Sequence, residues 1–515
     1  MPEIVLTTLN AKYIHAAFGL RYLLANLHSL RPAACIVEFD INQKPVDIAE
    51  VILARDPKIV GFGVYIWNVA PTTEVVATIK RVRPEIKIVL GGPEVSYETE
   101  GQRIVELADF VITGEADLKF AELCRNLLGG EPPPQKIIAA QLPDFSQLSL
   151  PYAFYDDRDI AHRVIYVEAS RGCPFTCEFC LSSLDIPVRQ VPLPALLEQL
   201  ARLLERGVKQ FKFVDRTFNL NVNVSRTILE FLLMRYEPGC FFHFEMIPDR
   251  LPDALREILI KFPTGALQFE VGIQTFNQQV GALIKRRQNY ERLEDNLKFL
   301  RSATGVHIHA DLIAGLPGES LASFAAGFDR LIALGPQEIQ VGTLKRLRGT
   351  PIVRHDAEWQ MIYNPHPPYE ILQNKLIDFA DMQKLRRFAR YWDLVGNSGN
   401  FVEATPLIWW ESLSPFAAFM RWSEWLHRRV GRSDGIALTR LMELLFEYLS
   451  DDMNLDRQNI ALKLWCDYQR GGRRDKPAFL KDALPGSESQ QLQQRTPSII
   501  PKRQARHNAA NPAAG

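Results

Sequence analysis

The stretch Arg171-Gly172-Cys173-Pro174-Phe175-Thr176-Cys177-Glu178-Phe179-Cys180 places three cysteines within eight residues of a 515-residue chain that has seven. The CxxxCxxC spacing brings three thiolates within reach of one small inorganic cluster, whereas an ordinary cubane takes four protein ligands. One iron would then stay open to another molecule. The alternatives are inert buried thiols or a structural zinc site, and zinc would need a fourth protein ligand that no CxxC or HxxxH pair elsewhere supplies. We therefore expect a three-cysteine iron–sulfur site at Cys173, Cys177 and Cys180.

This motif resembles the signature of the radical S-adenosylmethionine (radical SAM) superfamily, CxxxCxφC with an aromatic residue at φ. Phe179 stands at that position. The resemblance implies a 4Fe–4S cluster whose open iron is chelated by S-adenosylmethionine, which reduction cleaves to a 5′-deoxyadenosyl radical. In such a site the cofactor carries the chemistry, while the protein positions it and excludes water.

Composition limits the class of protein. With 47% hydrophobic residues the chain can build two or three domains, each with a sizeable core. Its 60 basic and 60 acidic residues cancel, which disfavours a nucleic-acid partner. Local basic clusters such as Lys345–Arg348 and Arg473-Arg474 are typical of a solvated face. We expect no signal peptide, no membrane span and a reducing, cytoplasmic location.

The first 130 residues predict alternating strands and helices. Short apolar runs at Ile4–Thr8, Ala34–Phe39, Ile59–Tyr65, Ile86–Leu90 and Phe110–Thr113 read as strands, and stretches of helical spacing lie between them, beginning with Gly19–Leu30. This order favours a doubly wound, flavodoxin-like parallel sheet, on which ligands bind beyond the carboxyl ends of the strands.

This domain resembles the cobalamin-binding module that precedes many radical SAM cores, because the strand ends Val-Leu-Gly-Gly-Pro-Glu94 and Ile-Thr-Gly-Glu115 are similar to its loops. Glycines there let the backbone approach a large planar ring. The residues that the resemblance assigns to cobalamin are Asn10, Tyr13, His15, Trp67, Asn68, Gly91, Gly92, Pro93, Gly114 and Glu115. The alternative is a degenerate domain of the same fold that binds nothing.

One departure from the family concerns the cobalt ligand. The usual motif after the first strand is DxHxxG, whereas here the loop reads Ala11-Lys-Tyr-Ile-His15-Ala-Ala-Phe-Gly19, without the aspartate and with the glycine one residue late. A loop histidine can equally cap a helix or fill a seam. We expect cobalamin to bind without a histidine ligand, with ligation by His15 as the less favoured alternative.

A second domain repeats strand–helix units through about residue 352. Strands are expected at Val164–Glu168, Phe211–Val214, Phe241–Met246, Leu267–Ile273, His307–Ile313 and Glu338–Thr343. Six such units favour a partial (β/α)6, TIM-like barrel, in which chemistry is carried at the carboxyl ends of the strands. Polar clusters follow nearly every one of these strands, which packing alone does not explain.

These clusters are similar to the family's cosubstrate site. Asp215 and Thr217 match the motif near the methionine amino group, and Gln274 with Thr275 matches the segment near the ribose. Glu245 is a carboxylate in an aromatic strand, where it would need a partner. The resemblance therefore assigns to S-adenosylmethionine the residues Phe179, Asp215, Thr217, Glu245, Gln274, Thr275, Asp311, Gly315 and Glu319, the last three from the segment expected to pack the adenine.

The expected organisation is a cobalamin-binding domain at 1–135, a linker at 136–160, a radical SAM barrel at 161–360, a helical C-terminal domain at 361–482 and a disordered tail at 483–515. The helical domain is rich in tryptophan, including Trp392, Trp409, Trp410, Trp422, Trp425 and Trp465. Such a domain would cap the mouth of the barrel and exclude water, although a plain helical bundle explains each tryptophan equally well.

The resemblance as a whole implies a cobalamin-dependent radical SAM enzyme that transfers a methyl group to an unactivated carbon or phosphorus centre. A cobalamin-dependent radical cyclase or oxidoreductase, a methylthiotransferase and a non-catalytic cobalamin or redox sensor remain alternatives. The expected partners are a small-molecule or lipid-like substrate, which the sequence does not identify, and a reductant such as flavodoxin or ferredoxin.

Overall fold

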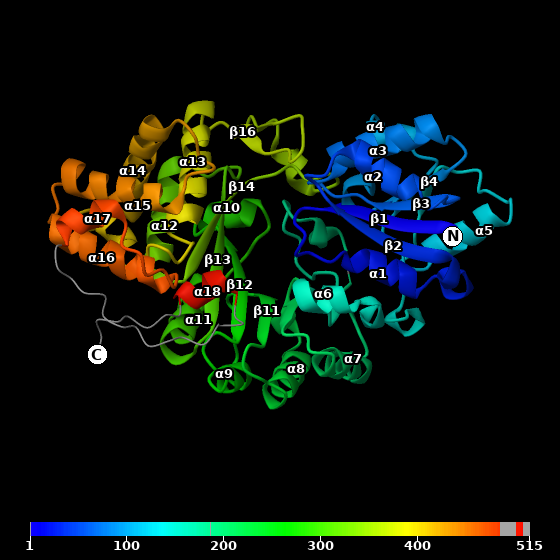
Figure 1. Cartoon of the computed structure of the whole chain (residues 1–515), viewed down its shortest axis with the longest axis horizontal. Coiled ribbons are helices and arrows are strands. Elements are labelled where there is room, and N and C mark those ends of the chain that lie inside the picture. The colour runs from blue at the N-terminus through cyan, green and yellow to red at the C-terminus, as the bar shows by residue number, and fades with distance from the viewer. Residues whose placement is uncertain (1, 186, 485–500, 508–515) are drawn as a thin grey trace. The chain divides into compact units, whose positions relative to one another are not determined.

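The computed structural model describes residues 2–185, 187–484 and 501–507 (Figure 1). The chain divides into two compact units. The first comprises Met1–Phe218, Lys345–Arg354 and Tyr363–Glu370, and the second comprises Asn219–Leu344, His355–Ile362 and Ile371–Gly515. Neither unit contains, among these residues, a helix that is long and apolar enough to cross a lipid bilayer.

The first unit opens with a six-stranded parallel sheet in the order β2-β1-β3-β4-β5-β6. Its strands are β1 (Ile4–Asn10), β2 (Ala34–Asp40), β3 (Ile59–Gly63), β4 (Lys87–Gly91), β5 (Phe110–Thr113) and β6 (Ile137–Ala139). The doubly wound sheet predicted from the apolar runs is confirmed. Strand β6 lies in the segment expected to be a linker, because residues 137–139 pair with β5 as the edge of the sheet.

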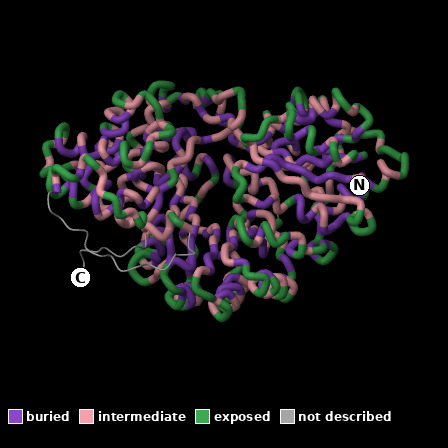
Figure 2. Tube along the Cα trace, viewed as in Figure 1, coloured by how far each residue is buried: buried purple, intermediate pink, exposed green. Residues whose placement is uncertain are grey.

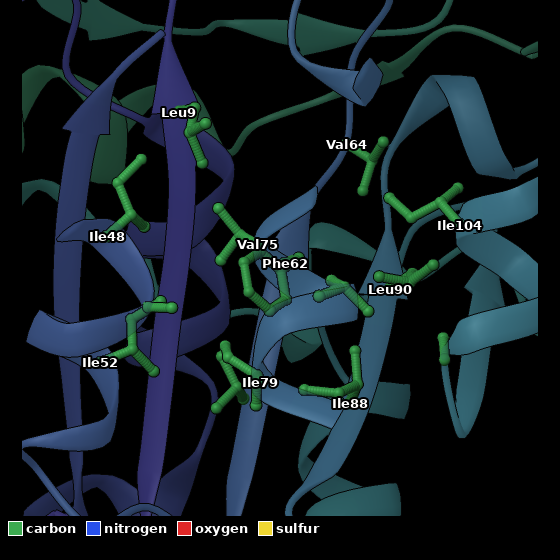
Figure 3. Packing of buried hydrophobic residues seen from close by; sticks show 14 of the residues in the cluster. Leu9, Ile48, Ile52, Phe62, Val64, Val75, Ile79, Ile88, Leu90 and Ile104 are labelled. Carbon is green, nitrogen blue, oxygen red and sulfur yellow. The ribbon is translucent and has the colours of Figure 1, made fainter. Parts of the chain in front are cut away.

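Helices cover both faces of this sheet. One face packs against α2 (Pro45–Leu53), α3 (Val69–Val82) and α4 (Arg103–Leu107), and Figure 3 shows Val75 and Ile79 beside Phe62 there, with Ile48 and Ile52 further along the same cluster. The other face packs against α1 (Phe18–Ala25) and α5 (Lys119–Leu128). Helix α1 ends earlier than the expected Leu30, because His28 takes a φ of 50° that no α-helix continues.

The rest of the first unit carries the cysteine motif. A helix, α6 (Asp157–His162), leads to β7 (Ile165–Val167), which pairs in parallel with β10 (Gln210–Phe213). Between them, β8 (Ser170–Arg171) and β9 (Arg189–Gln190) form a short antiparallel ladder on either side of the cysteine loop, and α7 (Leu193–Glu205) follows. The second sheet has the order β14-β13-β12-β11-β10-β7.

In the second unit, β11 (Phe241–Met246), β12 (Leu267–Gln274), β13 (His307–Ala314) and β14 (Glu338–Thr343) run in parallel. Their helices are α8 (Val222–Met234), α9 (Asp253–Leu259), α10 (Gln278–Leu283), α11 (Tyr290–Ala303) and α12 (Leu321–Leu334). Side chains alternate along β11, with Phe242 and Phe244 fully buried and His243 and Glu245 less so. The tube in Figure 2 shows the strands as mostly buried segments. The expected α/β class is confirmed, and the two larger sheets each have six strands.

The C-terminal region is helical, with α13 (Phe379–Val395), α14 (Pro415–Val430), α15 (Leu438–Glu447), α16 (Arg457–Arg470) and α17 (Ala478–Ala483). Aromatic rings join α13 and α14 to α12, since Phe328 lies 5.1 Å from Phe388 and 5.8 Å from Phe416 between ring centroids. Trp392, Trp422 and Trp465 are buried core residues, whereas Trp409 and Trp425 are half-buried and Trp410 is 70% exposed. A cap over the barrel mouth stays a prediction.

The expected disorder of residues 483–515 is wrong for one short stretch. Residues 502–507 form α18 (Lys502–His507), where Arg503 pairs with buried Glu338 at 2.8 Å and with Asp393 at 2.7 Å. These ion pairs give the segment partners that its polar composition could not reveal. Residues 485–500 and 508–515 lie outside the described residues, so the expectation is not tested there.

Candidate functional site

A cavity of about 280 Å³ lies at the carboxyl edge of the first sheet. Its wall is mostly apolar and comes from α1, from the ends of β3, β4 and β5, and from the segment before the cysteine loop. The lining residues are Phe18, Gly19, Leu20, Tyr22, Leu23, Gly61, Phe62, Gly63, Tyr65, Val89, Leu90, Gly91, Gly92, Ile112, Gly114, Glu115, Ala116, Asp117, Phe120, Glu168 and Arg171. A concave, largely apolar site with a few polar groups is typical of a binding pocket for an organic ligand.

Glycines shape this cavity by bringing backbone close to backbone. Gly92 has a φ of 107°, and a Cβ there would lie 2.5 Å from the carbonyl oxygen of Val64. On β3, a Cβ at Gly61 would lie 2.9 Å from the ring of Phe120. Glycine is therefore required at both positions by the close packing of the protein's own segments around the cavity. The mostly apolar lining and the glycines at the ends of β3, β4 and β5 suit one face of a large organic group such as cobalamin.

The sequence identified part of the wall. Of the residues expected to bind cobalamin, Gly91, Gly92, Gly114 and Glu115 line the cavity. The side chain of Asn68 is instead buried, donating to Leu9 O at 3.0 Å and to Thr8 Oγ1 at 3.1 Å. These hydrogen bonds join the start of α3 to β1, so Asn68 has a structural role.

Four other expected contacts lie outside the wall. Asn10 donates to Glu38 at 3.0 Å, Tyr13 accepts a hydrogen bond from Arg158 at 2.7 Å, and Trp67 stacks on Tyr65 with 4.4 Å between ring centroids. Pro93 begins a 3-10 turn behind Gly92. Trp67 is largely exposed, and its contact with the cavity wall is through Tyr65.

His15 contacts β7, the strand that precedes the cysteine loop. Its Nδ1 lies 2.6 Å from the hydroxyl of Tyr166, and its backbone forms an isolated parallel bridge with Val164. Burial, together with Lys212 and Lys12, lowers the pKa of the imidazole. Among the residues that the structure describes, His15 is not part of the cavity wall. These contacts favour a structural role.

The cysteine loop leaves the β8–β9 ladder through Gly172, whose φ is 90°. A Cβ there would lie 2.7 Å from the carbonyl oxygen of Asp185. The loop folds back on itself because the N–H of Cys173 donates to Asp185 O at 3.1 Å and the N–H of Cys180 to Cys177 O at 3.1 Å. Cys173 and Cys177 are buried, while Cys180 is half-buried, as is Phe179.

The donor set of this loop suits an iron–sulfur cluster, since it offers three thiol groups within eight residues. Within the described ranges, no group of three or more His, Cys, Asp or Glu side chains is arranged to hold a metal ion. Metal sites are commonly completed only when the metal binds. The three cysteines therefore remain the proposed ligands on the chemistry of the loop.

Asp215 anchors the segment that leads into this loop. Its carboxylate accepts the N–H of Ala169 at 2.9 Å and the hydroxyl of Ser170 at 2.6 Å. Burial raises the pKa of Asp215 to about 6. Thr217 is buried two residues further on. Asp215 was expected to touch S-adenosylmethionine, and its contacts in the structure are to the cysteine-bearing strand.

In the second unit, the end of β12 and the segment after β13 carry four of the expected cosubstrate residues, namely Gln274, Thr275, Gly315 and Glu319. Thr275 donates its hydroxyl to Glu319 at 2.6 Å, and burial raises the pKa of Glu319 to about 7. Gln274 sits at a register shift between β12 and β13 with a φ of 72°, and its buried Oε1 has no hydrogen-bond partner among the described residues. Strain and an unsatisfied polar atom at one position are typical of a ligand site.

The remaining expected residues share this part of the unit. Glu245 pairs in register with Glu270 on the neighbouring strand, and Asp311 lies 3.5 Å from His309, whose pKa burial lowers. Gly315 has a φ of 88°, and a Cβ there would lie 2.6 Å from the side chain of Ile371. The structure thus brings Gln274, Thr275 and Glu319 together.

Sequence reasoning missed the charged side of the cavity. Arg171 lines it together with Glu168 and Asp117, and stacks on the ring of Tyr22 at 4.3 Å. The Gly61-Phe62-Gly63 segment was also missed. Glycines inside a strand mark close approach of another group, so that signal was available in the sequence.

Comparison with known families agrees with this geometry. Residues 4–124 match the B12 binding domain, residues 167–331 match the radical SAM superfamily, and residues 357–511 match a family of unknown function, DUF4080. The chain is a radical SAM protein with a B12-binding domain. The cofactors expected from its sequence, a 4Fe–4S cluster with S-adenosylmethionine and a cobalamin, are those that these two families imply.

Curated relatives of this radical SAM protein match parts of it. An uncharacterised methyltransferase of Pyrococcus horikoshii is 31% identical over 199 residues, which cover 34% of this chain and 43% of the relative. The 2-(S-pantetheinyl)-carbapenam-3-carboxylate methyltransferase of Streptantibioticus cattleyicolor is 24% identical over 58% of this chain and 48% of its own. The chain thus spans less than half the length of either relative.

Solved structures share the fold. The radical S-adenosylmethionine methyltransferase TsrM from Kitasatospora setae superposes with a TM-score of 0.56 at 17% identity, covering 71% of this chain and 79% of its own. The cobalamin-dependent S-adenosylmethionine radical enzyme OxsB gives a TM-score of 0.59 at 14% identity, covering 94% and 80%. At these identities the likeness establishes the architecture of the radical SAM protein.

Proposed function

We propose that this radical SAM protein is a cobalamin-dependent methyltransferase that acts on an unactivated centre of a small-molecule or lipid-like substrate. One observation carries the proposal. Arg171 lines the glycine-shaped cavity and stands two residues before Cys173, so a site for a large organic cofactor and a cysteine loop for a cluster adjoin within one compact unit. The similarity to methyltransferases supports the reaction type.

When bound, the cluster with S-adenosylmethionine supplies a 5′-deoxyadenosyl radical and the cobalamin supplies a methyl group. Cys173, Cys177 and Cys180 would hold the cluster through their thiolates. Ala169, Ser170 and Asp215 fix the strand from which that loop starts. The apolar cavity wall would exclude water from the cofactor.

The polar groups of the second unit have a binding role in this proposal. Gln274 offers its amide Oε1 and Glu319 offers its carboxylate Oε2, and both atoms are buried without a hydrogen-bond partner among the described residues. Both oxygens accept hydrogen bonds, so they suit the hydroxyl and amino groups of S-adenosylmethionine. A reductant such as flavodoxin or ferredoxin would supply the electron.

The test begins with anaerobic reconstitution by iron, sulfide and hydroxocobalamin. We expect about four irons and one cobalt per chain, with the iron lost when Cys173, Cys177 and Cys180 are all replaced by Ala. After reduction, 5′-deoxyadenosine should form from S-adenosylmethionine, and S-adenosylhomocysteine should form only in the cobalamin-loaded protein. Iron without cobalt would overturn the methyltransferase assignment, and 5′-deoxyadenosine without S-adenosylhomocysteine would favour a cyclase or oxidoreductase.

A further inference from the structure

The basic segment Lys345–Arg348 is not a solvated face. Arg348 donates to the buried carboxylate of Glu94 at 2.9 Å, and the hydroxyl of Tyr369 donates to the same carboxylate at 2.7 Å. Arg348 also donates to the Tyr369 oxygen at 3.0 Å. Glu94 directly follows Gly92-Pro93, so these contacts hold the loop at the end of β4 that shapes the cavity.

The same segment is pressed against the β4 loop at a second point. The N–H of Gly349 donates to Glu98 at 3.0 Å, and Arg346 pairs with Glu98 at 3.1 Å. A Cβ at Gly349, whose φ is 80°, would lie 2.4 Å from the ring of Tyr97. Only glycine therefore allows residue 349 to lie this close to Tyr97.

Three residues further along, the segment reaches the cysteine loop. The N–H of Ile352 donates to Glu178 O at 2.9 Å, and Arg354 pairs with the Glu178 carboxylate at 3.0 Å. Glu178 is buried and lies between Cys177 and Phe179. Residues 345–354 thus join the β4 loop of the B12-binding domain to the middle of the cysteine motif, all within the first unit.

The other side of the cysteine loop is joined to the β5 loop. Arg171 donates to Glu115 at 2.8 Å and to both oxygens of Asp117 at 2.9 and 3.2 Å, while its Nε donates to Glu168 at 2.9 Å. Arg189 donates to Glu115 at 3.0 Å and to Asp185 at 3.0 Å. Asp185 in turn accepts the N–H of Cys173.

We infer that Arg171 and Arg348 are positioning residues that couple occupancy of the cavity to assembly of the cluster on the cysteine loop. The inference rests on the proposed function, because it takes cobalamin as the occupant of the cavity. A ligand in the cavity removes water from Arg171, which strengthens its ion pairs and fixes the start of the loop. Because coupling between two binding sites is reciprocal, a formed cluster then raises the affinity for cobalamin by the same factor.

Lysine is the informative replacement at both positions. It keeps the positive charge but loses the planar fork with which Arg171 holds Asp117 and Glu168 together, and with which Arg348 holds Glu94 and Tyr369. Arg21→Lys is a matched control. Arg21 is also buried in this unit and bridges Glu38 and Asp159 at 2.9 and 2.5 Å. It stands between Leu20 and Tyr22 of the cavity wall, but none of its ion pairs within the described residues is with the β4 loop, the β5 loop or the cysteine loop, so it controls for the loss of a buried arginine fork beside the cavity.

The experiment compares cobalamin affinity in two states of the full-length protein. Cluster-free protein is prepared by anaerobic chelation of iron, and cluster-loaded protein by reconstitution, with iron counted in both. Hydroxocobalamin is then bound by equilibrium dialysis and measured as cobalt per chain. In the wild type, and in Arg21→Lys, we expect the cluster-loaded state to bind about 5-fold or more tightly than the cluster-free state. In Arg171→Lys and Arg348→Lys that ratio should fall toward one.

Other outcomes overturn the inference in distinguishable ways. Equal affinity of the two wild-type states would show that the sites are independent, while leaving the proposed function intact. Retention of the full ratio in both lysine variants would remove Arg171 and Arg348 from the coupling. Failure of the wild type to bind cobalt in either state would reject the proposed function itself. The wild-type comparison needs no variant, so a variant that does not fold leaves the test decisive.

Discussion

The backbone N–H of Ala169 donates to both carboxylate oxygens of Asp215, at 2.9 Å from Oδ2 and 3.2 Å from Oδ1. Ser170 adds its hydroxyl to Oδ1 at 2.6 Å. One buried carboxylate just after β10 therefore holds Ala169 and Ser170, which precede the cysteine loop. Loss of that carboxylate should weaken binding of the cluster.

Asp215→Ala should lower the iron content after reconstitution. The substitution leaves two buried donors without an acceptor, at about 1–3 kcal/mol each, and frees the start of the loop. Asp215→Asn keeps one acceptor oxygen and should retain more iron. Iron and acid-labile sulfide per chain measure both variants, and an unaltered iron content in Asp215→Ala would show that the anchor is dispensable.

Gly92→Ala should weaken both the first unit and its cobalamin binding. At φ 107° and ψ 169°, Gly92 occupies a region that is nearly closed to other residues, and the new Cβ would lie 2.5 Å from Val64 O. We expect the free energy of unfolding, measured by urea denaturation, to fall by about 3 kcal/mol. The variant should also bind less cobalt per chain after reconstitution with hydroxocobalamin.

Gly101→Ala is the control for this substitution. Gly101 also has a positive φ, of 71°, but an added Cβ would meet nothing within 4 Å. Its cost should be about 1 kcal/mol from backbone strain alone, with cobalt binding unchanged. Equal effects of the two substitutions would mean that the contact with Val64 does not matter.

The sequence predicted local structure well because its signals were local. Apolar runs placed β1, β3, β4 and β5 within a few residues, and the glycines that follow β4 and β5, Gly92 and Gly114, lie in the cavity wall. The contacts of side chains with several possible partners were harder to predict. Tyr13 stood in the right loop, yet Arg158 and Arg163 lie over its ring at 5.2 and 4.7 Å.

Interactions between distant segments could not be predicted at all. Arg171 finds Glu115 and Asp117 more than fifty positions earlier, and Arg348 finds Glu94 at a separation of 254 residues. No periodicity or spacing carries that information, and a basic run looks solvated whether or not it has buried partners. The charged half of the site is therefore visible only once the fold is known.

His15→Ala should leave cobalamin binding and the electronic state of cobalt unchanged. The imidazole Nδ1 is 2.6 Å from the Tyr166 hydroxyl, and His15 lies outside the cavity wall as far as the described residues define it. Electron paramagnetic resonance of the reduced, cobalamin-loaded protein should therefore give the same spectrum for wild type and variant. Loss of a nitrogen hyperfine splitting in the variant would identify His15 as the cobalt ligand after all.

Glu319 should make the binding of S-adenosylmethionine depend on pH. Its pKa is raised to about 7 by burial, and a ligand that donates a hydrogen bond to Oε2 requires the ionised carboxylate. Affinity is thus about half its full value near pH 7, approaches the full value above pH 8 and falls as the pH drops, by about 10-fold at pH 6 relative to pH 8. The glutamine of Glu319→Gln cannot ionise, so the affinity of this variant for S-adenosylmethionine should lack this pH dependence. Dividing the dissociation constant of the variant by that of the wild type at each pH from 6 to 8 cancels any titration of S-adenosylmethionine itself. A ratio that does not change with pH would exclude Glu319 from the cosubstrate site.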